Sequence, residues 1–168
     1  GVHDIPPLVG RGVLLDMAKH MGKDVLAAGE NFGEAEIKAA AEAQGVAIGK
    51  GDIVLFHTGW TDGMLESEPQ AWVSGEPGLN VNGARYLASL DVMAVGADTW
   101  GLEPIPPAEG DGAFYGHVVL LQENGIYILE TMNTGPLARD DVSEFMFVLG
   151  QARIRGTVQM IVNPVALY

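Results

Sequence analysis

The chain has 168 residues, which suits one domain and allows about two-thirds of the unfolded surface to be buried. A net charge of -13 with only 9 scattered Lys and Arg residues argues against nucleic-acid binding, which needs clustered cations. No apolar run approaches the ~20 residues of a membrane span, so we expect no membrane partner. The absence of Cys excludes disulfides and thiolate ligands and favours a cytoplasmic location. The charged fraction of 18% is low, so we expect another subunit to cover part of the surface.

The first half of the chain predicts strands alternating with helices. A short buried strand is expected over residues 12–16, and an Ala-rich helix over 33–44 that ends at Gly45. A second strand follows the Gly51-Asp52 turn over 52–57. Residues 58–78 show no clear period and are interpreted as a long loop.

The second half continues this alternation. Helical spacing of apolar residues predicts a helix over 80–90 with Asn80 as its N-cap, and a strand over 92–95 runs into Asp98. After a Pro/Gly-rich connection over 102–112, a helix reaches Glu123 and a strand covers 126–129. One long or bulged strand is expected over 144–158, with Arg153 and Arg155 facing solvent or a partner, and an edge strand over 163–168.

His117 and Glu130 are the main candidates for a metal site. They bracket an apolar stretch interrupted by Asn124-Gly125, so a turn there can bring both side chains near one cavity. A hydrolytic metal site usually takes three or more protein ligands, and this chain supplies two good ones. His117 can alternatively be a hydrogen-bonded structural residue, whereas a carboxylate like Glu130 near a core needs a cation, a metal or several donors.

Three further residues follow predicted strands and are candidates for substrate binding. Thr58 and Trp60 come after the strand over 52–57, where the indole can form an apolar pocket wall or anchor a loop. Asp98 can cap a turn, or it can orient a metal ligand by a hydrogen bond without contacting the metal itself. The sequence has no Gly-x-Ser-x-Gly elbow, no Gly-x-x-x-x-Gly-Lys loop and no His-Glu-x-x-His helix, which excludes those catalytic classes.

Four segments in order resemble the cyclase family of metal-dependent hydrolases, which includes kynurenine formamidase and isatin hydrolase. The segments are Pro-Pro-Leu-Val-Gly-Arg-Gly-Val-Leu-Leu-Asp at 6–16, Gly-Asp-Ile-Val-Leu-Phe-His-Thr-Gly-Trp at 51–60, Gly-Ala-Asp-Thr-Trp at 96–100, and the stretch from His117 to Glu130. The resemblance implies an α/β, swivelling β/β/α fold over residues 1–168 and hydrolysis of a non-peptide amide or formamide, with a small molecule as substrate. It also implies His117 and Glu130 as ligands of a divalent manganese or zinc ion, and a homodimer or homotetramer.

The resemblance also implies what these 168 residues lack. The family's principal ligand motif, His-x-Gly-Thr-His-x-Asp, would lie upstream of Pro6, together with the His expected as general base, so the chain is interpreted as the carboxyl-terminal part of a longer domain. His57 stands where the family more often has Arg. Two alternatives stay open: a catalytically inactive module that binds a small molecule or a subunit, and a dehydrating cyclase of the same fold.

Overall fold

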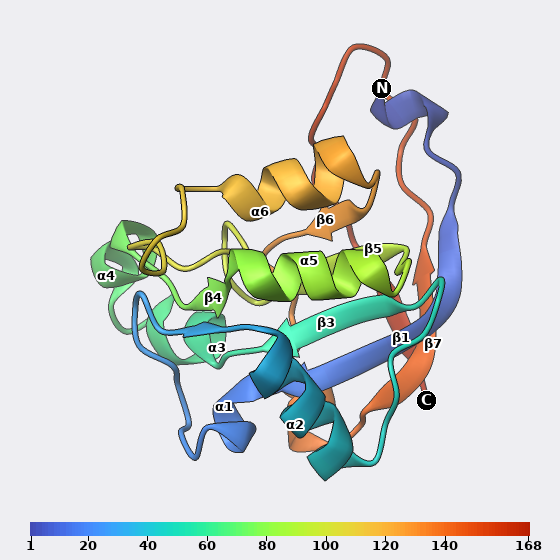
Figure 1. Cartoon of the computed structure of the whole chain (residues 1–168). Coiled ribbons are helices and arrows are strands. Elements are labelled where there is room, and N and C mark those ends of the chain that lie inside the picture. Colours follow the sequence, from blue (N-terminus) through green and yellow to red (C-terminus); the bar gives the residue numbers. More distant parts are fainter.

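A six-stranded sheet forms the centre of the protein, which is described by a computed structural model covering residues 1–168 (Figure 1). The strand order is β6-β5-β3-β1-β7-β8. The strands are, in chain order, β1 Leu8–Asp16, β3 Ile53–His57, β5 Ala94–Ala97, β6 Tyr127–Leu129, β7 Glu144–Leu149 and β8 Val165–Leu167. β1, β3, β5 and β6 run parallel, while β7 and β8 are antiparallel to their neighbours. A separate two-stranded sheet joins β2 Asn31–Phe32 and β4 Gly78–Leu79.

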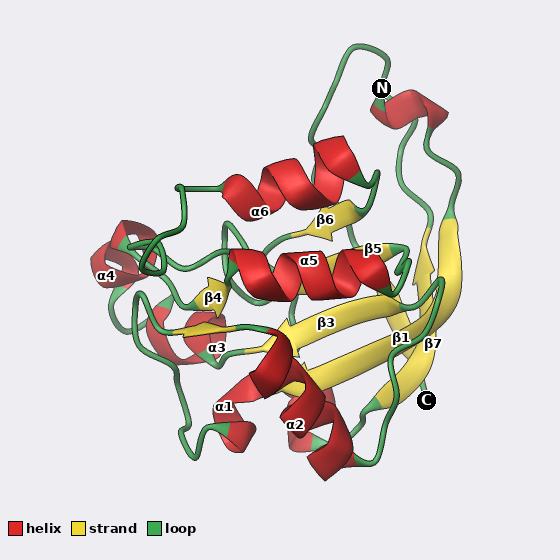
Figure 2. Cartoon of the chain, viewed as in Figure 1, coloured by secondary structure: helices red, strands yellow, loops and turns green.

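The helices are short, and several lie over one face of the central sheet (Figures 1 and 2). They are α1 Met17–His20, α2 Glu34–Gln44, α3 Trp60–Met64, α4 Pro69–Ser74, α5 Val81–Ser89, α6 Tyr115–His117 and α7 Gly135–Arg139, with a 3₁₀ turn η1 at Val2–Asp4. A π-helical segment, η2 Val118–Glu123, continues α6 without a break. None of the helices combines the length and the apolar character needed to cross a lipid bilayer.

Two apolar cores lie on opposite faces of the sheet, because successive strand residues point to opposite sides. Val54 and Phe56 of β3 belong to the larger core, with the inner faces of α2 and α5. Ile53 and Leu55 belong to the smaller one, with Leu137 of α7. β3 is therefore apolar on both faces, as expected for a central parallel strand. The predicted α/β fold class is confirmed.

Local signals in the sequence account for the helices that were predicted. Gly45 ends α2 in the left-handed conformation with φ 70°, and the Asn80 side chain accepts a hydrogen bond from the Gly83 amide at the start of α5. The strand predicted over 126–129 and the edge strand within 163–168 are also present, as β6 and β8. β1 begins four residues before the predicted start, and β5 is shifted by two residues.

Two predictions about the elements are wrong. Residues 58–78 are not a long loop, because they contain α3 and α4, which are too short to show a helical period. The long strand expected over 144–158 ends at Leu149, because Leu149 pairs with Leu8, the first residue of β1, and no partner strand extends further. Residues 150–162 form an irregular segment beside the N-terminus, where the Val2 amide donates to Thr157 O at 3.2 Å (Figure 2). Arg153 and Arg155 lie in it and are exposed, as expected.

Gly59, which precedes α3, is expected to be the glycine whose replacement costs most near the site. Its φ is +74°, and an added Cβ would lie 2.2 Å from Asp24 O. Gly59→Ala should therefore combine backbone strain with a backbone clash and lower the free energy of unfolding by about 3 kcal/mol or more. Gly22→Ala is the matched control in urea unfolding, since Gly22 has φ +70° and no atom within 4 Å. Equal losses for the two variants would mean that the clash is relieved without cost.

Candidate metal and ligand site

The candidate residues gather at one edge of the central sheet. β1, β3, β5 and β6 are parallel and in register, so their carboxyl ends meet at the same edge. Thr58 follows β3, Asp98 follows β5 and Glu130 follows β6. In open α/β sheets this edge is where ligands are usually bound.

His117 and Glu130 face each other, as the sequence predicted. His117 Nε2 lies 3.3 Å from Glu130 Oε1. The other ring nitrogen, Nδ1, lies 2.7 Å from Glu103 Oε1, and Glu103 also accepts the backbone N–H groups of Gly116 at 2.7 Å and His117 at 2.8 Å. Glu103 is only 4% exposed. This buried carboxylate fixes the orientation of the imidazole, so that Nε2 points toward Glu130.

The carboxylates of Glu103 and Glu130 determine the charge of the His117 side chain. The hydrogen bond that His117 donates to Glu103, and next the one it donates to Glu130, raise the pKa of His117 to about 9, although burial opposes this. The imidazole is therefore cationic at neutral pH and forms an ion pair on both sides. A carboxylate on one ring nitrogen and a second donor atom beside the other is the arrangement typical of metal-binding histidines.

Strained backbone surrounds this group. The non-glycine residues with positive φ include Leu102 at 64°, Phe114 at 55° and Thr131 at 54°. Leu102 precedes Glu103, Phe114 is the N-cap of α6, which ends at His117, and Thr131 follows Glu130. Bulky and β-branched residues rarely adopt this conformation, and such outliers cluster at functional sites. The π-helical segment that begins directly after His117 is a second feature often found at functional sites.

Thr131→Asn is expected to raise the free energy of unfolding by about 1 kcal/mol, because Asn tolerates the left-handed region far better than a β-branched residue. Thr131 is exposed, and its side chain makes no hydrogen bond within the chain. Asp91→Asn is the control in urea unfolding, since Asp91 has a similar φ of 58° and already tolerates it. A loss of stability in Thr131→Asn would show that the threonine itself is needed there.

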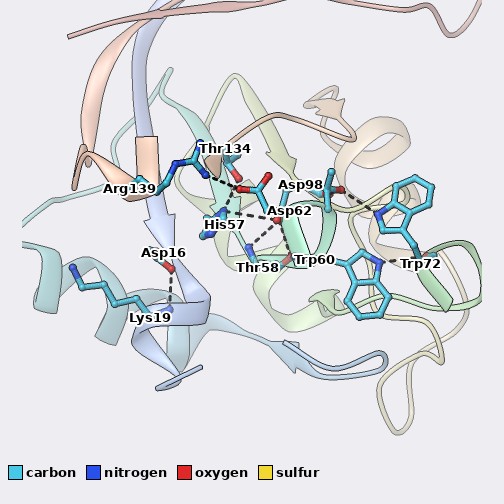
Figure 3. A network of polar contacts seen from close by, with 11 residues as sticks. Asp16, Lys19, His57, Thr58, Trp60, Asp62, Trp72, Asp98, Thr134 and Arg139 are labelled. Atoms are coloured by element: carbon cyan, nitrogen blue, oxygen red, sulfur yellow. Dashed lines mark hydrogen bonds and ion pairs between the residues drawn. The ribbon is translucent and has the colours of Figure 1, made fainter. Parts of the chain in front are cut away.

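Asp98 forms the centre of a second polar network (Figure 3). Its Oδ1 accepts hydrogen bonds from the Thr58 amide at 2.8 Å and the Thr58 hydroxyl at 2.7 Å. Its Oδ2 has no hydrogen-bond partner and lies 3.7 Å from Nδ1 of His57, which in turn lies 2.8 Å from Thr134 Oγ1. Burial raises the pKa of Asp98, whereas His57 and Thr58 act against that rise.

Trp60 lies beside this network, and a hydrogen bond links it to Trp72 (Figure 3). It is 4% exposed, and its indole N–H donates to Trp72 O at 3.3 Å. The Trp100 indole donates to the same oxygen at 3.0 Å, and the Trp72 indole donates to Thr61 Oγ1 at 3.2 Å. These bonds attach α4 to α3 and to the loop after β5, so Trp60 anchors a loop in this structure.

The cavity beside the His117 pair has a volume of about 970 Å³ and is mostly apolar. His117 and Glu130 line it, together with residues of β6 and of the irregular segment 150–162. Thr58, Trp60 and Asp98 do not line it. The structure thus brings Thr58 and Asp98 together but in a separate group from His117 and Glu130, and substrate binding by Thr58, Trp60 and Asp98 stays a prediction.

Two glutamates of the site were missed in the sequence. Glu103 lies in a stretch interpreted only as a Pro/Gly-rich connection, and Glu76 lies in the supposed loop. Glu76 is fully buried, its Oε2 accepts the Trp100 amide at 2.6 Å, and its Oε1 has no partner. Burial, and to a smaller extent the charges of Glu130 and Asp98, raise the pKa of Glu76 to about 8. No periodic or motif signal distinguishes either residue from an exposed loop glutamate.

The ligand atoms of His117 and Glu130 are of the kinds that bind a divalent metal ion. An imidazole nitrogen and a carboxylate oxygen are ligands that both zinc and manganese accept. Glu103 already supplies the carboxylate that such a histidine usually has on its other nitrogen. The chain does not, however, place three or more His, Cys, Asp or Glu side chains around one point where a metal could be held. His117 and Glu130 are thus two possible donors, fewer than a hydrolytic metal site usually has.

Three solved structures with similar folds are informative. A structure described as a novel cyclase is 26% identical with a TM-score of 0.83, covering 95% of this chain and 53% of its own. An isatin hydrolase bound to the product analogue thioisatinate is 18% identical with a TM-score of 0.77, covering 96% and 60%. A predicted metal-dependent hydrolase from Bacillus stearothermophilus is 23% identical with a TM-score of 0.62, covering 89% and 59%. The similarity to the isatin hydrolase and to the Bacillus stearothermophilus protein indicates only a shared fold.

The chain spans between 53% and 60% of the length of these three proteins. No curated protein matches it. The family model Cyclase, described as "Putative cyclase", matches residues 1–104, which is more than half of the 168 residues. The α/β fold expected from the resemblance is also the fold of the solved neighbours. The chain belongs to the cyclase family.

Proposed function

We propose that the protein containing this chain is a metal-dependent hydrolase that acts on a non-peptide amide or formamide, cyclic amides included. The observation that carries this proposal is the geometry of His117, whose Nδ1 is held by Glu103 while Nε2 faces Glu130. The neighbours support the reaction class, because they include an isatin hydrolase and a metal-dependent hydrolase. Because the chain spans only part of their length, the activity is proposed for the protein that contains it.

His117 Nε2 and a Glu130 oxygen would hold the divalent ion, for which we propose manganese or zinc. When bound, such an ion lowers the pKa of a coordinated water and polarises the scissile carbonyl. Glu103 keeps Nε2 directed at the site through its bond to Nδ1. Because these residues supply two donors, a complete site needs further ligands and a general base. Thr58 and Asp98, with Trp60, remain the proposed substrate-binding group.

Hydrolysis by the metal-loaded protein that contains this chain tests the proposal. We expect turnover of an N-formyl arylamine or of isatin, and a loss of at least about 100-fold in kcat/KM in His117→Gln, because one ligand is removed. His20→Gln is the control, since His20 is exposed and distant in sequence from the site. Activity that survives His117→Gln at the wild-type rate contradicts the proposal, and analysis of the product separates hydrolysis from dehydration.

The second candidate function is a catalytically inactive module of the same fold that binds a small molecule or a subunit. The observation that favours it is that only two possible metal ligands come together in the chain. A metal-free protein that still binds an amide at the His117 cavity would support this alternative. The cytoplasmic location and the homodimer or homotetramer expected from the sequence also remain proposals.

A further inference from the structure

A second cavity, separate from that of His117, lies at the carboxyl ends of β1 and β3. It has a volume of about 410 Å³ and shares no lining residue with the cavity beside His117. His57 lines it, and so do three cationic side chains and two acidic ones, which are Lys19, Lys23 and Arg139, and Asp16 and Asp24. Figure 3 shows His57, Arg139, Asp16 and Lys19 around this region. Neither the metal site nor the proposed hydrolysis uses it.

His57 is held rigidly at the inner side of this cavity. Its side chain is 12% exposed, and Nδ1 lies 2.8 Å from the hydroxyl of Thr134, which is 1% exposed. The buried Asp98 Oδ2 lies 3.7 Å from the same nitrogen and has no hydrogen-bond partner. Nε2 makes no hydrogen bond within the chain. When Thr134 donates to Nδ1, Nε2 carries the ring proton and can donate it to a ligand.

The cations at the cavity are unusual for this protein. The chain has a net charge of -13 and only 9 Lys and Arg residues, and three of these line the same small cavity. Lys23 Nζ pairs with Glu30, which is half-buried, whereas the partners of the other two cations are on the surface: Lys19 Nζ lies 2.8 Å from Asp141, and Arg139 Nη1 lies 2.9 Å from Asp62. Exposed pairs of this kind contribute about 0–1 kcal/mol, so an anion can compete for these cations at little cost.

We propose that this cavity binds a small carboxylate, to which His57 Nε2 donates a hydrogen bond while Arg139 and Lys19 supply positive charge. Thr134 acts as the positioning residue for the imidazole, because its hydroxyl lies 2.8 Å from Nδ1. The two acidic side chains at the cavity, Asp16 and Asp24, favour a singly charged ligand over a dianion, because each additional negative charge is repelled at close range. This inference is independent of the proposed hydrolysis, since it uses neither His117 nor Glu130.

Titration of the ¹⁵N-labelled chain with sodium acetate, followed by NMR at constant ionic strength, tests this inference. We expect saturable shifts of the His57 ring and of the Gly22 and Lys23 amides, whereas sodium chloride should not produce them. Inorganic phosphate should bind at least about threefold more weakly than acetate at a pH where it is mainly a dianion. Shifts of equal size with chloride overturn the proposal, and tighter binding of phosphate overturns the choice of a carboxylate.

Variants distinguish a specific anion-binding site from general electrostatic attraction of anions. His57→Gln should weaken acetate binding at least about tenfold, and Arg139→Gln at least about threefold, because each removes one direct contact. Lys50→Gln is the matched control, since Lys50 is an exposed lysine paired with Asp91 and lies outside the cavity. If His57→Gln fails to fold, Arg139→Gln decides alone, because Arg139 is exposed. Unchanged affinity in Arg139→Gln overturns the proposal.

Discussion

Glu103→Ala is expected to lower the free energy of unfolding by about 3–5 kcal/mol, because it leaves several buried donors without an acceptor. Glu103 accepts the amides of Gly116 and His117 and pairs with His117 Nδ1. Its removal also leaves the His117 imidazole with one carboxylate partner in place of two. Urea unfolding monitored by circular dichroism measures the loss.

Two further variants make this result interpretable. Glu103→Gln keeps an oxygen acceptor but removes the charge, so it should lose less stability than Glu103→Ala while lowering the pKa of His117 from its raised value. Glu109→Ala is the control, because Glu109 is an exposed glutamate in the same connection. If Glu103→Ala loses no more stability than Glu109→Ala, the buried carboxylate does not hold the site together.

Glu76→Gln is expected to remove a large part of the dependence of stability on pH. Burial raises the pKa of Glu76 from 4.5 to about 8, so the folded protein keeps this group protonated where the unfolded chain ionises it. Stability from this group is complete below about pH 4.5 and declines as the pH rises to about 8. The decline amounts to roughly 3–5 kcal/mol at most. The free energy of unfolding of Glu76→Gln should therefore equal that of the wild type near pH 4.5 and exceed it at pH 8.

The test compares the free energies of unfolding of wild type and variant at each pH, measured by urea unfolding from pH 4.5 to pH 9. Groups that do not interact with Glu76 contribute equally in both proteins and cancel in the difference between their free energies of unfolding. Glu66→Gln is the control, because Glu66 is exposed and should give a difference that does not change with pH. A flat difference for Glu76→Gln as well would mean that Glu76 is ionised in the folded protein.

The elements with strong local signals could be predicted from the sequence. α2 and α5 have marked ends at Gly45 and Asn80, and β3 is a continuous apolar run after a turn. α3 and α4 could not be predicted, because five or six residues are too few to show a helical period. The end of β7 could not be predicted either, because it depends on where its partner β1 begins.

The site could be predicted only in part. The approach of His117 to Glu130 followed from the turn at Asn124-Gly125, and the structure confirms it at 3.3 Å. Glu103 reaches His117 from a connection that has no regular structure, so nothing local indicates its burial. The contact between His57 and Thr134 joins residues 77 positions apart, across β3 and α7, and depends on tertiary packing alone.

Binding of Mn²⁺ to the chain, followed by paramagnetic broadening of its NMR signals, tests the central claim most directly. At substoichiometric Mn²⁺ we expect selective broadening of the amides around His117 and Glu130, and we expect this pattern to disappear in both His117→Gln and Glu130→Gln. Excess Mg²⁺ in the buffer suppresses general attraction of cations to a chain with net charge -13. Broadening that is spread over the acidic surface, and that stays the same in His117→Gln, would contradict the assignment of His117 and Glu130 as metal ligands.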